Sequence, residues 1–194
     1  MISVFTVSHN IEYLEQAYKS LLDQSYENWE WVILLNGAAA EIPTFEIQNE
    51  RVRIYRTSEG EGNIGWLKGK AVSYCKGMIF LELDHDDVLM PNALQEVHKT
   101  FMEYPEASFA YSDTIRINHN RTPNLELFDA SHGWTTYAHD GYIAHHSFEP
   151  HPHNVGYIWY APNHLRAFTR EAYEIAGGYA DQPILDDSDL MCRL

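Results

Sequence analysis

The sequence predicts an α/β fold in which helices cover both faces of a mostly parallel central sheet. Its expected strands are continuous apolar runs, a pattern typical of strands that are buried on both faces. Segments with helical spacing separate these runs, and the repeated order of strand, helix and strand predicts a doubly wound sheet with right-handed crossovers. The chain has 194 residues, which suits one domain with a substantial core.

The first part of the chain contains three expected strands, at residues 2–7, 30–35 and 51–56. The runs ISVFTV and EWVILL are rich in β-branched and apolar residues, and Asn36-Gly37 after the second run favours a turn. The segment between these two runs has helical spacing and predicts a helix with one apolar face. That face consists of Leu14, Ala17, Tyr18, Leu21 and Leu22.

Two more helices and two more strands are expected after a glycine-rich loop at residues 58–65. The strands are MIFLEL at 78–83 and ASFAYSD at 107–113. Pro91 suits the first turn of the helix between them, because a missing N–H costs nothing at that position. The expected apolar faces are Leu67, Ala71, Tyr74, Cys75 and Met78 for the first helix, and Leu94, Val97, His98 and Phe101 for the second.

Periodicity fails between residues 119 and 158, a stretch rich in His, Asn, Pro, Gly and aromatic residues. Long irregular segments inside compact domains are usually functional lids or binding segments. A regular pattern returns at 164–179, where Gly177-Gly178 ends a short helix, and at 186–194. This last helical pattern has no stop signal, so we expect the protein to continue beyond it.

Composition and charge narrow the class of partner. The formal net charge of −15 argues against nucleic acid, because a phosphate backbone needs cationic groups to replace its counterions. A phosphorylated small molecule is still compatible, since a bound divalent cation reverses the local field. Cys75 and Cys192 form neither a metal-ligand spacing nor a disulfide framework, which suits a reducing cytosol. No apolar run reaches transmembrane length, and the first residues already read as a strand and not as a signal peptide.

An acidic cluster follows the expected strand at 78–83: Asp84, Asp86 and Asp87. In an open parallel sheet, ligands bind beyond the carboxyl ends of the strands. Two carboxylates about 4 Å apart repel by roughly 4 kcal/mol at an effective dielectric constant of about 20, so the cluster calls for a counter-charge. Asp-x-Asp on a tight turn offers hard oxygen ligands for Mg²⁺ or Mn²⁺. The alternative is that Asp86 and Asp87 only cap the helix that begins near Pro91.

Five blocks, in order, resemble the successive motifs of family 2 glycosyltransferases. They are VFTVSHN, YLEQAYKSLLDQSYENWEWVILLNG, GNIGWLKGKAVSYCKGMIFLELDHDDVLMPNAL, FAYSD and GGYADQPILDDSDLMCRL. The resemblance implies a single GT-A domain, a Rossmann-like fold, over residues 1–194, with donor binding in about 1–115 and the acceptor side in about 116–194. It also implies transfer of a sugar from a nucleotide diphosphate sugar to a saccharide, lipid-linked or protein acceptor, with inversion at the anomeric carbon.

The resemblance assigns roles to both acidic groups. Asp84, Asp86 and Asp87 take the place of the motif that holds the metal, Mn²⁺ or Mg²⁺, on the donor diphosphate. Asp187 takes the place of the catalytic base, with Asp186 beside it. A base on the face opposite the leaving group is what one-step inversion requires. The alternative is that Asp186 and Asp187 are an N-cap and first-turn acids, which the helix dipole favours.

Donor contacts are implied for several polar residues of the matching blocks. The first loop supplies Thr6, Ser8 and Asn10, and the end of the second strand supplies Asn36. The family often has Asp-Asp-Gly-Ser where this chain has Leu-Asn-Gly-Ala, so the nucleobase is left open, although Asn36 still offers an acceptor and a donor. Asn63, Gly65 and Lys70 match the loop and helix that flank the donor, and Lys70 replaces the commoner Arg. Lys70 is equally well read as a solvated helix residue.

The irregular region has two competing interpretations. Its aromatic residues and histidines suit an acceptor pocket, because rings stack on sugar faces and imidazoles bond hydroxyls. Alternatively the aromatic residues build a local core. The spacings of the histidines in this region match no common zinc-binding pattern. His164, which follows the region, is a further candidate metal ligand. The aromatic residues are Trp134, Tyr137, Tyr142, Tyr157 and Trp159, and the histidines are His132, His139, His145, His146, His151 and His153.

Two rival functions remain open. A nucleotidyltransferase of similar build predicts a basic, glycine-rich phosphate loop near the N-terminus, and VSHNIEYLEQ is not one. A non-catalytic module that binds nucleotide sugars predicts that the acids at 186–187 point away from the pocket. The expected setting is the cytoplasm, including peripheral contact at the cytoplasmic face of a membrane.

Overall fold

The computed structural model describes residues 1–42, 47–118, 122, 124, 133–151, 153–154 and 162–194. They form two compact units, one of Met1–Ala110 with Ala167–Leu194 and the other of Tyr111–Arg166. The last 28 residues therefore belong to the same unit as the first strands. The division into a donor part at 1–115 and an acceptor part at 116–194 stays a prediction.

The first unit is built on a six-stranded sheet with the order β3-β2-β1-β4-β9-β5. β1 is parallel to both β2 and β4, and β2 is parallel to β3, which confirms the predicted α/β class. Every residue of β2 is buried, as expected for a strand covered on both faces. The strands are β1 Ile2–Ser8, β2 Trp29–Leu35, β3 Val52–Arg56, β4 Ile79–Glu82, β5 Phe109–Tyr111 and β9 Arg166–Thr169.

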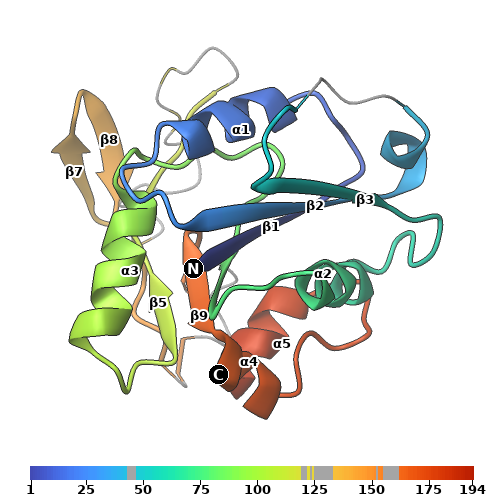
Figure 1. Cartoon of the computed structure of the whole chain (residues 1–194). Helices are drawn as coiled ribbons and strands as arrows, with labels where there is room; N and C mark the ends of the chain where they lie inside the picture. The colour runs from blue at the N-terminus through green and yellow to red at the C-terminus, as the bar shows by residue number, and fades with distance from the viewer. Residues whose placement is uncertain (43–46, 119–121, 123, 125–132, 152, 155–161) are drawn as a thin grey trace. The chain divides into compact units, whose positions relative to one another are not determined.

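Helices pack on both faces of this sheet. Figure 1 shows α1 over one face and α2, α4 and α5 over the other. Side chains of successive strand residues point to opposite faces, so Phe5 packs in the cluster with Leu67 of α2, whereas Trp31 stacks on Tyr18 of α1. The helices are α1 Leu14–Leu22, α2 Ile64–Ser73, α3 Ala93–Glu103, α4 Arg170–Ile175 and α5 Asp186–Arg193, with a short 3-10 helix at Gly37–Ala40.

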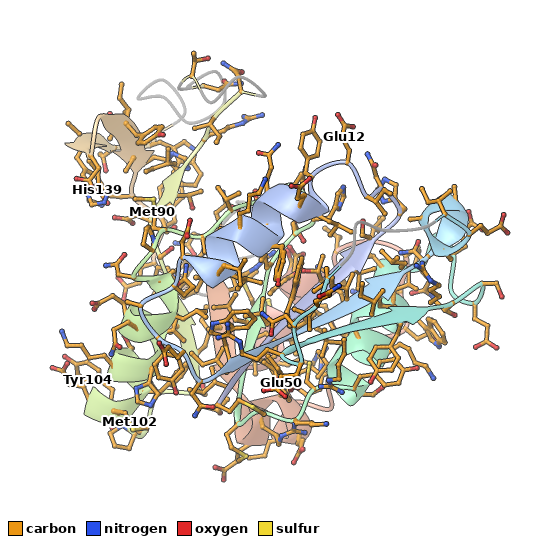
Figure 2. The ribbon with its side chains drawn as sticks, turned by 45° about the horizontal axis from the view of Figure 1, so that its top comes forward. Glu12, Glu50, Met90, Met102, Tyr104 and His139 are labelled. Carbon is orange, nitrogen blue, oxygen red and sulfur yellow. The ribbon has the colours of Figure 1, made fainter. Side chains whose placement is uncertain are left out.

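Two residues that were predicted to lie on buried apolar helix faces, Met78 and Leu22, are exposed instead. Met78 is exposed because α2 ends at Ser73, so Met78 lies in the turn before β4 and not on a helix. Gly77 makes that turn, and its N–H donates to Ser3 Oγ at 2.7 Å. Leu22 is the last residue of α1 and is also exposed. Figure 2 shows Met102 and Tyr104 at the carboxyl end of α3, where both side chains are exposed.

The second unit contains a small antiparallel sheet with the order β6-β8-β7, where no regular element was predicted. Its strands are β6 Thr114–Ile115, β7 Thr136–His139 and β8 Tyr142–His145. His139, labelled in Figure 2, precedes the turn that joins β7 to β8. Asp140 and Gly141 form this turn with φ of 48° and 82°, and Asp-Gly is a strong signal for such hairpins. The dipeptide was therefore the overlooked signal.

A buried carboxylate ties the strands together at the amino end of the first unit's sheet. Glu30 of β2 accepts hydrogen bonds from Ser3 Oγ at 2.6 Å and from Lys76 N at 2.5 Å, and it forms an ion pair with Arg53. Burial raises the pKa of Glu30, but the hydrogen bonds from Ser3, Lys76 and Arg53 outweigh it, so the pKa lies below its ordinary value.

Replacing this carboxylate should destabilise the fold in a pH-dependent way. We expect Glu30→Gln to lower the free energy of unfolding by about 2 kcal/mol at pH 7. Since the folded pKa lies below the ordinary value of 4.5, the contribution is full above that pH and is lost as the pH falls through the folded pKa. Urea unfolding from pH 7 to pH 4 should show the gap between parent and variant narrowing. An equal gap at both pH values contradicts this, and the exposed Glu15→Gln is the control.

Candidate active site

The carboxyl ends of the first unit's central strands meet at one edge. β1 lies between β2 and β4, so the chain leaves the sheet on the same side after Ser8, Leu35 and Glu82. After β1, the chain adds β2 and then β3 on one side of β1, and it then crosses back to add β4 on the other side. Ligands in open α/β sheets bind at such a switch point.

Thr6 stabilises this edge of the sheet through hydrogen bonds of its side chain to residues of two neighbouring segments. Its hydroxyl donates to the Leu83 carbonyl oxygen at 2.7 Å and accepts from Trp31 Nε1 at 2.9 Å. The Thr6 side chain is buried, so it holds the exit of β4 beside β1. Its position suits a structural role for the hydroxyl, while its predicted donor contact stays a prediction.

The acidic cluster forms a tight turn directly after β4. Asp87 N–H donates to the Asp84 carbonyl oxygen at 3.2 Å. A carboxylate oxygen of Asp84 lies within 4.8 Å of one of Asp87, and Asp86 is exposed on the same turn. The pKa of Tyr13 is raised by burial, by its hydrogen bond and charge interaction with Glu12, and by the charge of Asp86. The turn lies beside the loop before α1, since the ring centroids of His85 and His9 are 5.2 Å apart.

This turn has the donor set that a hard divalent cation requires. Mg²⁺ and Mn²⁺ take carboxylate oxygens at about 2.1 Å, so two oxygens on one ion lie up to about 4.2 Å apart. The carboxylate oxygens of Asp84 and Asp87 lie within 4.8 Å of each other, which is close to that range. Capping does not explain these acids, since α3 has Asn92 at its N-cap. The N–H of Leu94 in its first turn is bonded to Gln24 Oε1 at 3.0 Å instead.

The loop after β1 is organised by its own polar side chains. Ser8 Oγ donates to the Asn10 carbonyl oxygen and accepts from Asn10 N at 3.1 Å. Asn10 Oδ1 accepts from Glu12 N at 3.0 Å. Asn36 is buried next to this loop, and its N–H donates to the Ser8 carbonyl oxygen at 2.9 Å. The structure thus brings Ser8, Asn10 and Asn36 together.

An open surface hollow of about 480 Å³ lies at the carboxyl ends of β2 and β3, where Gly37, the residue after Asn36, lines it. Its volume is within the range of small-ligand pockets. Arg56, the last residue of β3, supplies a cation to its wall, and this residue was not predicted as a site residue although it ends a predicted strand. The lining residues are Gly37, Ala38, Ala40, Glu41, Arg56, Thr57, Ser58 and Glu61.

The start of α2 is fastened to the segment that leads into α5. Asn63 caps α2 by accepting from Trp66 N at 3.0 Å, and its amide also bonds Asp181. Gly65 N–H donates to the Gln182 carbonyl oxygen at 3.0 Å. Lys70 lies over the rings of Trp66 and Tyr74, with its Nζ 6.0 and 5.6 Å from their centroids. Donor contacts of Asn63, Gly65 and Lys70 stay predictions.

Asp186 is held in a buried group of charges that the sequence analysis missed. Lys68 Nζ lies 2.7 Å from Asp186 Oδ2 and also forms an ion pair with Glu82. Burial raises the pKa of Asp186, Lys68 lowers it, and the charges of Asp187 and Glu82 raise it, with a net upward shift. The available signal was Lys68 itself, which shares the apolar stripe of Val72 and Cys75 and therefore needs a buried partner.

Asp187, the predicted base, follows Asp186 in the first turn of α5. Its Oδ1 accepts from Ser188 N at 2.8 Å, and the residue is half-buried. Leu185, and neither aspartate, occupies the N-cap. Asp186 and Asp187 are therefore first-turn acids, as the alternative interpretation predicted, but neither is the N-cap. The role of Asp187 as the catalytic base stays a prediction.

The second unit has its own polar cluster around Asp113. Asp113 Oδ2 accepts from Tyr137 OH at 3.0 Å and lies 3.0 Å from His146 Nδ1, while the Tyr137 and His146 rings stack. Trp134, in contrast, is buried against His145 and Phe148, which favours the local-core interpretation for this residue.

Other candidates of the irregular region are placed as follows. His164 belongs to the second unit, where its Nε2 lies 2.8 Å from Arg166 Nη2, and its role as a metal ligand stays a prediction. His151 and His153 stack on each other. His132, Tyr157 and Trp159 lie outside the described residues.

Comparison with known proteins identifies the family. A family model described as glycosyl transferase family 2 matches residues 3–171. The chain belongs to glycosyl transferase family 2. This membership agrees with the resemblance carried by the five sequence blocks.

Individual relatives are more distant. The chain is 27% identical to the chondroitin synthase of Pasteurella multocida (strain Pm70) over 193 residues, which cover 94% of this chain and 17% of the synthase. Staphylococcal TarS 1-349 in complex with UDP superposes with a TM-score of 0.62 at 12% identity, over 99% of this chain and 53% of TarS. The chain therefore spans less than two thirds of these relatives.

A third relative agrees with the fold. The mannosyltransferase PcManGT from Pyrobaculum calidifontis, in complex with GDP-Man and Mn²⁺, superposes with a TM-score of 0.56 at 17% identity, over 96% of this chain and 49% of that enzyme. These likenesses confirm the predicted GT-A fold. In the described ranges, no helix has the length and hydropathy needed to cross a bilayer.

The contact between α2 and the segment before α5 should be sensitive to one methyl group. A Cβ at Gly65 would lie 2.1 Å from the Ala180 carbonyl oxygen, whereas a Cβ at Gly69 on the same helix would meet its nearest atom at 3.8 Å. We expect Gly65→Ala to lower the free energy of unfolding by about 2 kcal/mol. Gly69→Ala should raise it by about 0.5 kcal/mol through helix propensity. Urea unfolding compares them, and equal stabilities of the two variants would refute the contact.

Proposed function

We propose that this chain is the catalytic domain of a metal-dependent inverting glycosyltransferase. Its donor is a nucleotide diphosphate sugar, and it transfers a hexosyl or N-acetylhexosaminyl group. The observation that carries the proposal is the acidic turn of Asp84 and Asp87 at the sheet edge that also presents Ser8 and Asn36. Family membership supplies the reaction class.

Donor binding follows from the chemistry of this edge. A nucleoside has hydrogen-bonding groups for the amide of Asn36, and the adjoining hollow has room for a small ligand. The complexes of TarS with UDP and of PcManGT with GDP-Man and Mn²⁺ support a nucleotide donor for a domain of this fold. Asn36 stands where the family often has an acid. Because its amide both donates and accepts hydrogen bonds, uracil and other nucleobases are compatible with this position.

Each acidic group has a separate task in the proposed reaction. Asp84, Asp86 and Asp87 would hold Mn²⁺ or Mg²⁺, which when bound neutralises the charge that develops on the departing diphosphate. Asp187 would accept the proton of the acceptor hydroxyl while its oxygen forms the new bond to the anomeric carbon. The inversion requires these two tasks to lie on opposite faces of the sugar, which is why two separate carboxylate groups are needed.

The acceptor and the setting are proposed more broadly. A saccharide, lipid-linked or protein acceptor fits the family, and the chondroitin synthase relative supports a saccharide. We place the reaction in the cytoplasm or at the cytoplasmic face of a membrane, where nucleotide sugars are available and thiols such as Cys75 and Cys192 stay reduced. A non-catalytic sugar-nucleotide-binding module is the second candidate, and the distinction depends on Asp187.

Removing the acids of the turn should abolish metal-dependent donor binding. With UDP- and GDP-sugars at about 100 times the dissociation constant, a ligand stabilises the folded state by about 2.7 kcal/mol, which raises the melting temperature by about 5 °C or more. We expect this shift only with Mn²⁺ or Mg²⁺, and expect Asp84→Asn and Asp87→Asn to lose it. Asp23→Asn, at the exposed end of α1, is the matched control. An equal shift in EDTA would exclude the metal role.

The base assignment separates catalysis from binding. Asp187→Asn should reduce sugar transfer by about 10² to 10⁴ while the dissociation constant of the donor changes little, since the proton is moved only during the reaction. Calorimetry measures donor binding, and release of nucleoside diphosphate with a panel of oligosaccharide acceptors measures turnover. Turnover at the parent rate in Asp187→Asn rejects the assignment. Donor binding without any turnover in the parent favours the non-catalytic module.

A further inference from the structure

Lys68 occupies a buried position between two carboxylates of different elements. Its side chain is 9% exposed, and those of Glu82 and Asp186 are 3% and 7% exposed. Its ammonium group reaches Glu82 at the end of β4 and Asp186 at the start of α5. Tyr179 OH also lies 3.4 Å from Glu82 Oε2. One cation thus joins α2, β4 and α5 in the core of the first unit.

The amino end of α5 has a weak cap. Leu185 at the N-cap has φ of 60°, and within the described chain its side chain makes no capping hydrogen bond. A left-handed conformation costs free energy for a residue other than glycine. Upstream, the bonds from Asn63 to Asp181 and from Gly65 to Gln182 hold the approaching segment on α2. The Lys68–Asp186 pair continues this series of contacts into the helix itself.

Charge makes the lysine hard to replace. Two carboxylates buried beside each other repel strongly, and burial further penalises their ionised forms. Without the ammonium group, one of the two carboxylates has to take up a proton, or Asp186 has to move away from Glu82. Asp186 lies in the first turn of α5, so its displacement disturbs that turn, and Asp187 is the next residue.

We propose that Lys68 is a positioning residue of the transfer reaction, which fixes the Asp187 carboxylate by anchoring Asp186 in the first turn of α5. The proposal rests on the proposed function, in which Asp187 accepts the proton of the acceptor. Lys68 itself touches neither donor nor acceptor in this account. Its loss should therefore reduce turnover and leave donor binding intact.

The test compares variants that break the pair from either side. Lys68→Met removes the Lys68–Asp186 contact, and Asp186→Asn removes the charge of Asp186 on which the ion pair depends. Glu82→Gln keeps this ion pair while removing the charge of the other partner. Lys68→Arg retains a cation, and Lys19→Met on the exposed side of α1 is the control for loss of a lysine. Hydrogen exchange of the α5 amides, donor calorimetry and turnover are measured well below each melting temperature.

We expect α5 amides to exchange at least 10-fold faster in Lys68→Met and Asp186→Asn, while β1 amides keep their protection. Turnover should fall about 10- to 100-fold in both, the donor dissociation constant should stay within 2-fold, and Lys68→Arg should recover part of the loss. Glu82→Gln should retain α5 protection.

Unchanged α5 protection in both Lys68→Met and Asp186→Asn overturns the proposal, and so does a parallel loss of donor binding and turnover. If Lys68→Met fails to fold, the result for Asp186→Asn decides the question, because Lys68 keeps its ion pair with Glu82 in that variant. A parent that transfers no sugar contradicts the proposed function instead, and in that case α5 exchange still shows whether Lys68 anchors the helix.

Discussion

The parallel pairing of β1 with both β2 and β4 is the constraint on which the candidate site depends. It makes β1 a central strand, and it brings the exits of all three strands to one edge of the sheet. The chain must turn there, so polar residues that follow different strands become neighbours. Ser8, Asn36 and Asp84 are separated along the chain and share this edge for that reason. The internal bonds of Thr6 to Leu83 and Trp31 keep the exits aligned.

Carboxylates in the first unit fall into two kinds with different environments. Glu30, Glu82 and Asp186 are buried, and each forms an ion pair with Arg53 or Lys68. These acids hold elements together, because a buried charge has to be matched by a counter-charge. The acids of the turn after β4 are more exposed and follow one another in the chain. In a chain of net charge −15, such a concentration of acids at a ligand-binding edge suits a cation.

The sequence predicted the fold well where local pattern and burial agree. Continuous apolar runs predicted β1, β2 and β4, and the apolar spacing around Leu67 predicted α2. Met78 was misjudged because helical periodicity says nothing about where the chain leaves the helix. The hairpin at Asp140-Gly141 was missed because its strands have little apolar alternation to reveal them, even though its turn chemistry is clear.

The site was less predictable than the fold. Chain order was enough to place Asp84 and Asn36 at one edge, because parallel strands share their carboxyl ends. The ion pairs of Lys68 were not foreseeable, since they join three elements whose packing depends on the whole unit. The close approach of Ala180 to Gly65 was not foreseeable either, because it also depends on how distant segments of the unit pack.

The central claim is that the turn after β4 binds a divalent cation at this edge. Paramagnetic broadening of amide NMR signals by Mn²⁺ tests it most directly, because the effect falls steeply with distance from the ion, and Mg²⁺ provides the diamagnetic reference. If the turn binds the ion, low concentrations of Mn²⁺ broaden the amide signals of residues 84–87 first and those of Ser8 and Asn36 next. Broadening centred on another acidic part of the chain, or none at the turn, would contradict it.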